Sequence, residues 1–217
     1  MKHFLLGRAS VNREAYILDV CSNKKVLHIG FADWPITKER IKTSSWLHSK
    51  ITDVSTLCVG IDSNSEAVAL LKNEYGVENI HCQNAESIGF SEEINFDVIV
   101  AGEIIEHLSN PGLFIESVKG YMGADTKLII TTVNAFCFRK ILQVARNIES
   151  VHPDHVCYYS HTTLETIMKR YGFELKESYS YAIPNKKPLL PYLVESVAKL
   201  VSPNWCEGIV HAYMLKK

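Results

Sequence analysis

The chain has 217 residues, of which 47% are apolar, and its formal net charge is −1. This length fits one domain with a sizeable core, and the apolar fraction excludes a disordered chain. The near-zero net charge argues against a general electrostatic attraction to nucleic acid or acidic membranes.

Six cysteines are spread along the chain without any C-x-x-C pair. Several lie in apolar runs, which is typical of buried free thiols in a reducing compartment and not of a disulfide framework or a zinc site. The N-terminal residues do not resemble a signal peptide, and no apolar run approaches the ~18 residues of a membrane span. The sequence therefore predicts a cytoplasmic protein with at most peripheral membrane contact.

Short apolar runs alternate with segments of helical spacing. Runs rich in Val and Ile predict buried strands, and apolar residues three or four apart predict helices. The first half is expected to contain a helix over residues 10–20, strands over 24–30 and 56–62, a helix over 63–75, and strands over 79–83 and 96–102. The second half is expected to contain a helix from 110 to about 122, a strand over 126–133, a helix over 136–150, a helix that a Thr162–Glu165 capping box opens and Gly172 ends, and strands over 173–181 and 208–216.

This alternation predicts an α/β fold. We expect a Rossmann-like three-layer sandwich around a mostly parallel seven-stranded sheet with an antiparallel last strand. The whole chain, residues 1–217, is expected to be one domain. Residues 31–52 and 183–206 are expected to be insertions on the substrate side.

Polar residues follow the expected strands at the edge where open parallel sheets bind ligands. Asp62 ends the second strand, where an acid either accepts both hydroxyls of a ribose or caps the next helix. The stretch KVLHIGFADWP, residues 25–35, carries one glycine where a pyrophosphate site needs three. Its bulky and acidic side chains argue against a nicotinamide oxidoreductase. They favour a cofactor without phosphates that combines an adenosine with a charged amino-acid tail, namely S-adenosylmethionine.

Six stretches occur in an order that resembles class I S-adenosylmethionine-dependent methyltransferases, in the branch that includes ubiquinone-biosynthesis O-methyltransferases. They are KVLHIG, VGIDSNSEAV, CQNAESIGF, FDVIVAGEIIEHLSNPGLFIESVKGYM, TKLIITTVN and HTTLETIMKRYGFEL, and they cover roughly residues 20–181. The resemblance implies that the Gly30 turn supports the methionine part, that Asp62 holds the ribose, and that Ala85 and Glu86 lie near the adenine. The implied cofactor residues are Gly30, Phe31, Asp62, Ser63, Asn84, Ala85 and Glu86.

Some positions depart from the family pattern. The family usually has an acid where His28 stands, and further glycines where Ala32 and Trp34 stand. Asn84 replaces a frequent aspartate near the adenine, although an amide still accepts a hydrogen bond.

The segment EIIEH, residues 103–107, follows the fourth strand. If it forms one helical turn, two carboxylates and an imidazole share a face and suit a divalent cation such as Mg²⁺, Mn²⁺ or Zn²⁺. Relatives that carry a Glu-x-x-Glu-His turn plus a later His imply the ligands Glu103, Glu106, His107 and His155.

The EIIEH segment also has interpretations that involve no metal. His107 is expected to be catalytic together with Glu103, either as a general base or as part of a cation site, and a purely structural role is a further alternative. If a metal occupies His107, then His152 or His161 becomes the base.

The acceptor is expected to be a hydroxyl of a sugar, a glycan or another small molecule. The Asp-Trp-Pro and Trp-Leu-His segments look similar to methyltransferases of bacterial surface-polysaccharide clusters. Trp34, Trp46 and Trp205 are expected either to shape a substrate pocket or to pack in the core. RNA is not favoured, because the 23 Lys and Arg residues are scattered among 24 acids. A homodimer and a non-catalytic S-adenosylmethionine-binding or regulatory protein of the same fold are further alternatives.

Overall fold

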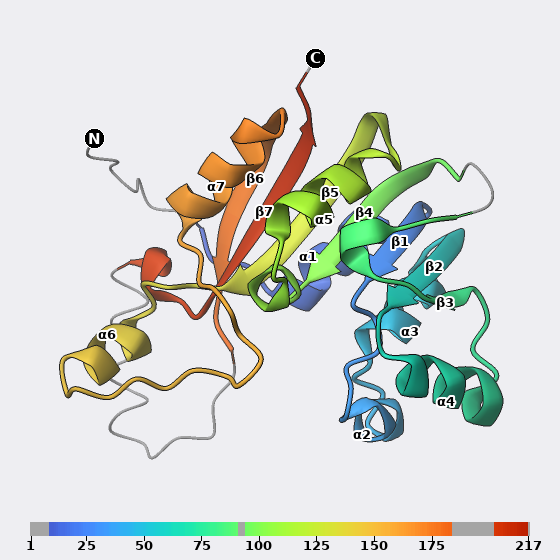
Figure 1. Ribbon diagram of the computed structural model, residues 1–217, viewed down its shortest axis with the longest axis horizontal. Coiled ribbons are helices and arrows are strands. Elements are labelled where there is room, and N and C mark those ends of the chain that lie inside the picture. The colour runs from blue at the N-terminus through green and yellow to red at the C-terminus, as the bar shows by residue number, and fades with distance from the viewer. Residues whose placement is uncertain (1–8, 91–93, 184–201, 217) are drawn as a thin grey trace.

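The computed structural model describes residues 9–90, 94–183 and 202–216 (Figure 1). Most of the expected insertion at residues 183–206 lies outside these ranges. No helix of the described residues is long and apolar enough to cross a membrane. All six cysteines are free thiols, as the sequence predicts.

Seven strands form one sheet in the order β3-β2-β1-β4-β5-β7-β6. They are β1 (Lys25–Ile29), β2 (Leu57–Asp62), β3 (Ile80–Cys82), β4 (Phe96–Gly102), β5 (Met122–Val133), β6 (Phe173–Tyr181) and β7 (Gly208–Leu215). Neighbouring strands from β3 to β5 are parallel, and β7 runs antiparallel to both β5 and β6. The mostly parallel sheet with an antiparallel last strand is therefore confirmed.

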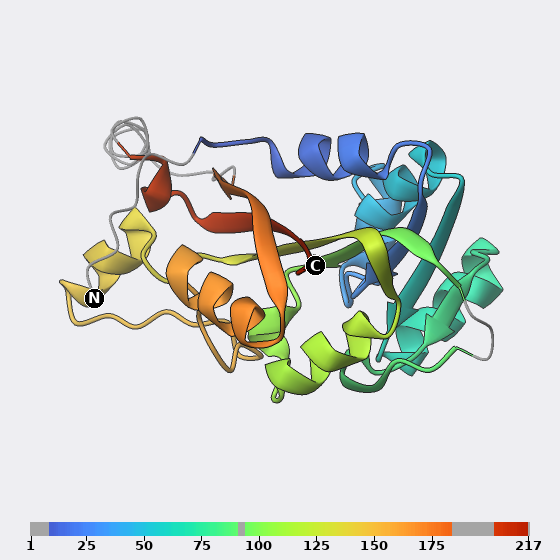
Figure 2. The ribbon, with the colours of Figure 1, turned by 90° about the horizontal axis from the view of Figure 1, so that it is seen from above.

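Helices cover both faces of the sheet (Figure 2). They are α1 (Arg13–Cys21), α2 (Thr37–Lys42), α3 (Leu47–Val54), α4 (Ser65–Tyr75), α5 (Pro111–Lys119), α6 (Phe138–Val144) and α7 (His161–Arg170). Apolar side chains of α1 and α3 pack on one face, and those of α5 and α7 pack on the other. The sandwich therefore has the three expected layers.

Two helices differ from the sequence prediction. The helix expected over residues 136–150 ends at Val144, because α6 has no buried side chain to hold a longer helix against the core. The helix α7 begins at His161, where Ser160 and Thr163 form the capping box, so the Thr162–Glu165 box is wrong. The Ser160 hydroxyl accepts from the Thr163 backbone amide, and this local competition was not visible in the sequence.

His28, which stands where the family has an acid, is a core residue. Its side chain is buried, and its Nδ1 lies 3.2 Å from Nδ1 of His48 on α3. One Nδ1 must donate and the other accept, so only one of the two Nδ1 atoms carries a proton. Burial lowers the pKa of His48 to about 4 and that of His28 well below its ordinary value. The segment at residues 31–52 thus supplies a packing partner for β1.

This buried pair predicts a loss of stability in acid. Because the folded pKa of His48 is depressed, its contribution is present above the unfolded value of about 6.5 and is lost as the pH falls toward 4. Between pH 7.5 and pH 5.0 the free energy of unfolding should fall in both the wild type and His48→Leu. We expect this fall to be about 1–2 kcal/mol smaller in His48→Leu. Urea denaturation at both pH values measures this difference, and equal losses would contradict the assignment.

Candidate active site

A cavity of about 160 Å³ opens at the carboxyl ends of β1 and β2. Its walls combine the ends of these strands with the segments that follow β3 and β4. The lining residues are Ile29, Gly30, Ile61, Asp62, Ser63, Gln83, Asn84, Ala85, Ile104, His107 and Leu108. The structure therefore brings together five of the seven predicted cofactor residues. Gln83, Ile104 and Leu108 line the cavity as well, but the sequence carried no signal for them.

Gly30 makes the turn out of β1 that forms one wall of the cavity. Its φ of +73° lies in the left-handed region, and a Cβ at this position would come within 3.1 Å of the Ile104 side chain. The Gly30 amide donates to the Ile61 carbonyl over 2.9 Å, which fixes the turn against β2. Gly30 combines a left-handed conformation with this close contact, and the two together exclude a larger residue there.

Asp62 ties the β1 turn to the start of α4. Its Oδ2 accepts from the Ala32 amide at 3.1 Å, and its Oδ1 accepts from the Asn64 amide at 2.9 Å. The N-cap of α4 is Asn64, whose side chain accepts from the Ala67 amide, so Asp62 is not the helix cap. Each carboxylate oxygen has the capacity for a second hydrogen bond. The Asp62 side chain is partly buried and lines the cavity.

The predicted cofactor residues Phe31 and Glu86 lie outside the cavity wall. The Phe31 side chain is buried against Trp46 and His48, and its carbonyl accepts from the Trp46 indole at 2.8 Å. The Glu86 carboxylate instead accepts from the backbone and side-chain nitrogens of Asn110. Neither residue lines the cavity, and each contacts residues outside it.

Glu103 opens into a second cavity of about 510 Å³, lined by Asn12, Arg13, Glu14, Arg40, Glu103, Tyr181, Ala182 and Ile183. The Glu103 Oε1 accepts from the Tyr181 hydroxyl at 2.5 Å and from the Thr131 hydroxyl at 2.9 Å. Burial and this carboxylate raise the pKa of Tyr181 well above its usual value, so the phenol is the donor. Two guanidinium groups, of Arg13 and Arg40, and two carboxylates, of Glu14 and Glu103, thus line this cavity.

Arg13 reaches this cavity across the end of β4. Its guanidinium donates to the Thr131 hydroxyl at 2.9 Å and lies 5.8 Å from the centre of the Tyr181 ring. A Cβ on Gly102 would lie only 2.5 Å from an Arg13 nitrogen, so glycine leaves room for the guanidinium. Sequence reasoning missed Arg13, Arg40 and Tyr181, because they come from segments far apart in the chain.

The EIIEH segment does not place both glutamates beside the histidine. Residues Ile105–His107 form one 3-10 turn, and Glu103 has a positive φ of 54°, so the expected shared helical face does not exist. The Glu106 side chain is fully buried, with Oε2 accepting from the Thr132 hydroxyl at 2.9 Å. Burial, and then the nearby Glu103, raise the pKa of Glu106 above its ordinary value.

His107 meets two other histidines instead. Ring centroids lie 4.6 Å apart for His107 and His155, 5.9 Å for His107 and His152, and 5.1 Å for His152 and His155. One nitrogen from each ring lies within 4.8 Å of the others. The predicted metal ligands His107 and His155 are therefore together, whereas Glu103 and Glu106 bond elsewhere. His161, the other fallback base, is buried near His211, with a ring nitrogen at 2.9 Å.

The predicted tryptophans take different roles. Trp46 is buried in the core and Trp205 stacks on Phe138 with centroids 5.5 Å apart, whereas Trp34 is 42% exposed. Of these three, Trp34 is the most exposed.

A family profile described as a methyltransferase domain matches residues 3–178 of the chain. None of the curated proteins matches the sequence significantly.

Solved structures with low sequence identity share the fold. The YcgJ protein from Bacillus subtilis is 16% identical with a TM-score of 0.60, over 94% of this chain and 98% of its own. An S-adenosylmethionine-dependent methyltransferase from Clostridium acetobutylicum is 10% identical with a TM-score of 0.63, over 94% and 91%. One from Mesorhizobium loti is 10% identical with a TM-score of 0.59, over 93% and 95%.

The Gly30 turn generates a stability prediction. An alanine there must hold a left-handed conformation against Ile104, so Gly30→Ala should lower the free energy of unfolding by about 1–2 kcal/mol. The control is Gly89→Ala, where an added Cβ meets no atom within 4 Å and the change should stay within about 0.5 kcal/mol. Denaturant unfolding measures both, and similar losses would refute this account of the turn.

Proposed function

Because this chain belongs to the methyltransferase domain family and is a class I S-adenosylmethionine-dependent methyltransferase, we propose that it methylates a hydroxyl oxygen of a sugar, a glycan or another small molecule. The observation that carries the proposal is the cavity that joins Gly30, Asp62 and His107. It combines a backbone turn, a carboxylate and an imidazole at the edge where parallel sheets bind ligands.

The smaller cavity is our proposed adenosine site. Asp62 accepts the ribose hydroxyls with the lone pairs that the Ala32 and Asn64 amides leave over. Ala85 presents a small side chain and Asn84 a backbone segment to the adenine. Ile104 and Leu108 add the apolar surface that a purine requires.

The larger cavity is our proposed site for the amino-acid tail. It adjoins the first cavity, because Glu103 precedes Ile104 and Arg40 lies 3.9 Å from Asp33 in the turn after β1. A carboxylate suits the planar guanidinium groups of Arg13 and Arg40, and an ammonium suits Glu103. This assigns Glu103 to cofactor binding in place of the catalytic role that the sequence predicted.

His107 is our proposed activating residue. The cofactor supplies an electrophilic methyl group on a sulfonium, and the protein aligns an acceptor hydroxyl with it. As the oxygen bonds to the methyl carbon, the carbon–sulfur bond breaks and the hydroxyl proton must leave. An imidazole is the side chain that most often accepts a proton in such transfers. His107 lines the cavity and faces the histidine-bearing connector, so it stands between cofactor and acceptor.

We propose that exposed aromatic rings and apolar side chains bind the acceptor. Trp34 is 42% exposed and Phe136 60% exposed, and such rings pack on the apolar face of a sugar. The apolar side chains Ile141, Val144 and Ile148 suit either the acceptor or a second copy of the chain.

We place the enzyme in the cytoplasm, because its cysteines are free thiols. Neither Glu103 nor Glu106 belongs to the group of side chains whose spacing suits a cation within the described residues.

We expect Asp62→Asn to weaken S-adenosylmethionine binding by at least roughly tenfold, or about 1.4 kcal/mol. The amide NH₂ would face one of the two backbone N–H groups that the carboxylate now accepts from, and only one acceptor oxygen would remain for the ribose hydroxyls. The matched control is Asp97→Asn, since Asp97 also accepts a backbone amide, that of Lys25, at the opposite end of the sheet. Calorimetric titration with S-adenosylmethionine measures both variants. Equal affinity in wild type and Asp62→Asn would exclude the proposed ribose site.

Turnover is measured as S-adenosylhomocysteine formation with a panel of nucleotide sugars, oligosaccharides and phenols. With the acceptor that responds, His107→Ala should lower kcat by about 100-fold or more, since positioned proton transfer contributes this much. The control is His81→Ala, at an exposed position on β3. A His107→Ala enzyme with a near-wild-type rate would rule out the activating role. A protein that binds the cofactor but methylates no hydroxyl in the panel would count against a hydroxyl acceptor.

A further inference from the structure

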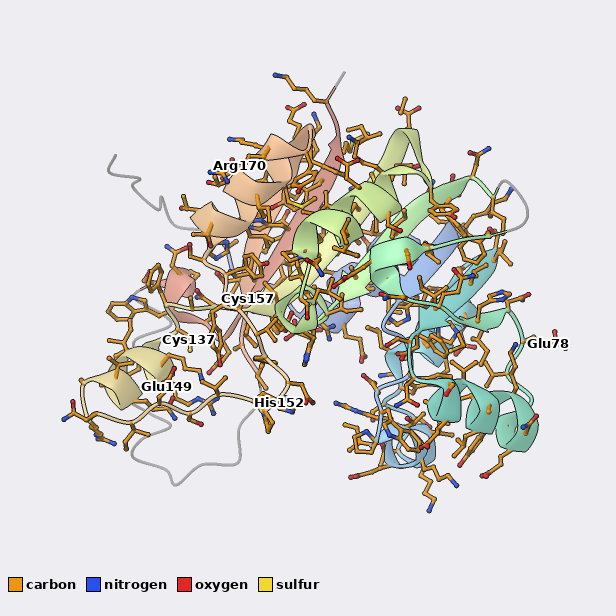
Figure 3. All side chains as sticks on the ribbon, in the orientation of Figure 1. Glu78, Cys137, Glu149, His152, Cys157 and Arg170 are labelled. Carbon is orange, nitrogen blue, oxygen red and sulfur yellow. The ribbon has the colours of Figure 1, made fainter. Side chains whose placement is uncertain are left out.

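Three histidines from two separate segments meet beside the proposed cofactor cavity. His107 ends the 3-10 turn after β4, and His152 and His155 lie on the connector between α6 and α7, where Figure 3 labels His152. One ring nitrogen from each lies within 4.8 Å of the other two. Within the described residues this is the one group of histidine, cysteine and carboxylate side chains with such spacing.

Backbone hydrogen bonds hold the two segments together. The amides of Val156 and Cys157 both donate to the Glu106 carbonyl, at 2.9 and 3.3 Å. The His155 amide donates to the His152 carbonyl at 3.0 Å and closes a turn between the two histidines. The meeting of the three rings is therefore a consequence of the main chain and not of side-chain rotamers alone.

We propose that His107, His152 and His155 form a three-imidazole site for one divalent cation of borderline softness, such as Zn²⁺ or Co²⁺. A tetrahedral zinc ion with bonds of about 2.0–2.1 Å sets its nitrogen ligands roughly 3.4 Å apart. The observed spacing exceeds this by little more than an ångström. The His152 side chain is 57% exposed and free to close that distance.

The hydrogen bonds of the rings fit this assignment. The His155 Nδ1 is buried without a hydrogen-bond partner among the described residues, which is a costly state for a polar atom. A cation gives this nitrogen a partner. The His152 Nδ1 lies 3.7 Å from a carboxylate oxygen of Asp154 and 3.3 Å from the Asp154 amide nitrogen. When Nδ1 carries the ring proton and faces the carboxylate, Nε2 keeps the lone pair that a cation takes.

The chemistry of the ligands decides which cation is bound. Imidazole suits zinc, cobalt, nickel and copper, whereas Mg²⁺ and Ca²⁺ prefer oxygen ligands. The predicted set that included Glu103 and Glu106 suited a harder ion. Those carboxylates bond through one oxygen each to Tyr181, Thr131 and Thr132, and neither belongs to the group of three histidines.

Three protein ligands leave a fourth position open, as in catalytic zinc sites. Because His107 also lines the cofactor cavity, this position faces the place where the acceptor hydroxyl must stand. There the cation lowers the pKa of the hydroxyl, and the proton passes to water, because His107 as a ligand no longer acts as the base. The resulting alkoxide bonds to the methyl carbon as the carbon–sulfur bond breaks. This role, though not the binding of the cation, rests on the proposed function.

Cation binding is tested on the untagged full-length protein after dialysis against a chelator. Calorimetric titration with Zn²⁺, and absorption spectra during titration with Co²⁺, should show one equivalent bound and the intense visible bands of a tetrahedral cobalt site. His152→Ala and His155→Ala should each weaken binding by roughly tenfold or more. His81→Ala should leave it unchanged, since His81 lies at an exposed position on β3.

Each outcome decides the proposal. A wild-type protein that binds neither cation, or variants that bind as tightly as the wild type, would overturn it. The S-adenosylmethionine titration is run separately without metal, so the two hypotheses fail independently. A protein that binds S-adenosylmethionine but no cation refutes the metal site and leaves the proposed function standing. A protein that binds the cation but not S-adenosylmethionine refutes the proposed function and leaves the metal site standing.

Discussion

The reversal of strand order between β1 and β4 is the constraint on which the rest of the site depends. From β1 the sheet grows toward β2 and β3 on one side, and from β4 toward β5 on the other. The loops after these two central strands therefore part, and a crevice forms outside their carboxyl ends. Gly30 and Glu103 flank this crevice, both with positive φ angles. The chain thus turns sharply after each central strand and leaves space between the turns.

Glu103 shows how distant parts of the chain hold this crevice in shape. A left-handed conformation at a residue other than glycine costs on the order of 1 kcal/mol or more, and it needs support from its surroundings. Here the support comes from the hydroxyls of Thr131 on β5 and Tyr181 on β6. Arg13 on α1 bonds to the same Thr131 and lies against the same Tyr181 ring. Glu103 and its two hydroxyl partners thereby link the first helix, the centre of the sheet and the edge strand β6.

The sequence predicts the strands well, because a doubly covered parallel strand needs a continuous apolar run that is visible without any tertiary information. It also predicts Gly30 and Asp62, since their places follow directly from where β1 and β2 end. Its account of the EIIEH segment was wrong in geometry, because it assumed one helical turn. Whether a residue such as Glu103 takes a helical or a left-handed conformation depends on Thr131 and Tyr181, which no local pattern reveals.

The histidine cluster follows from the same geometry. Once Glu103 turns toward Tyr181, the next residues wind into a 3-10 turn that buries Glu106 against Thr132. The side chain of Glu106 fixes the turn to the sheet, while its carbonyl accepts from two amides of the connector. One residue thus anchors both segments that carry the histidines.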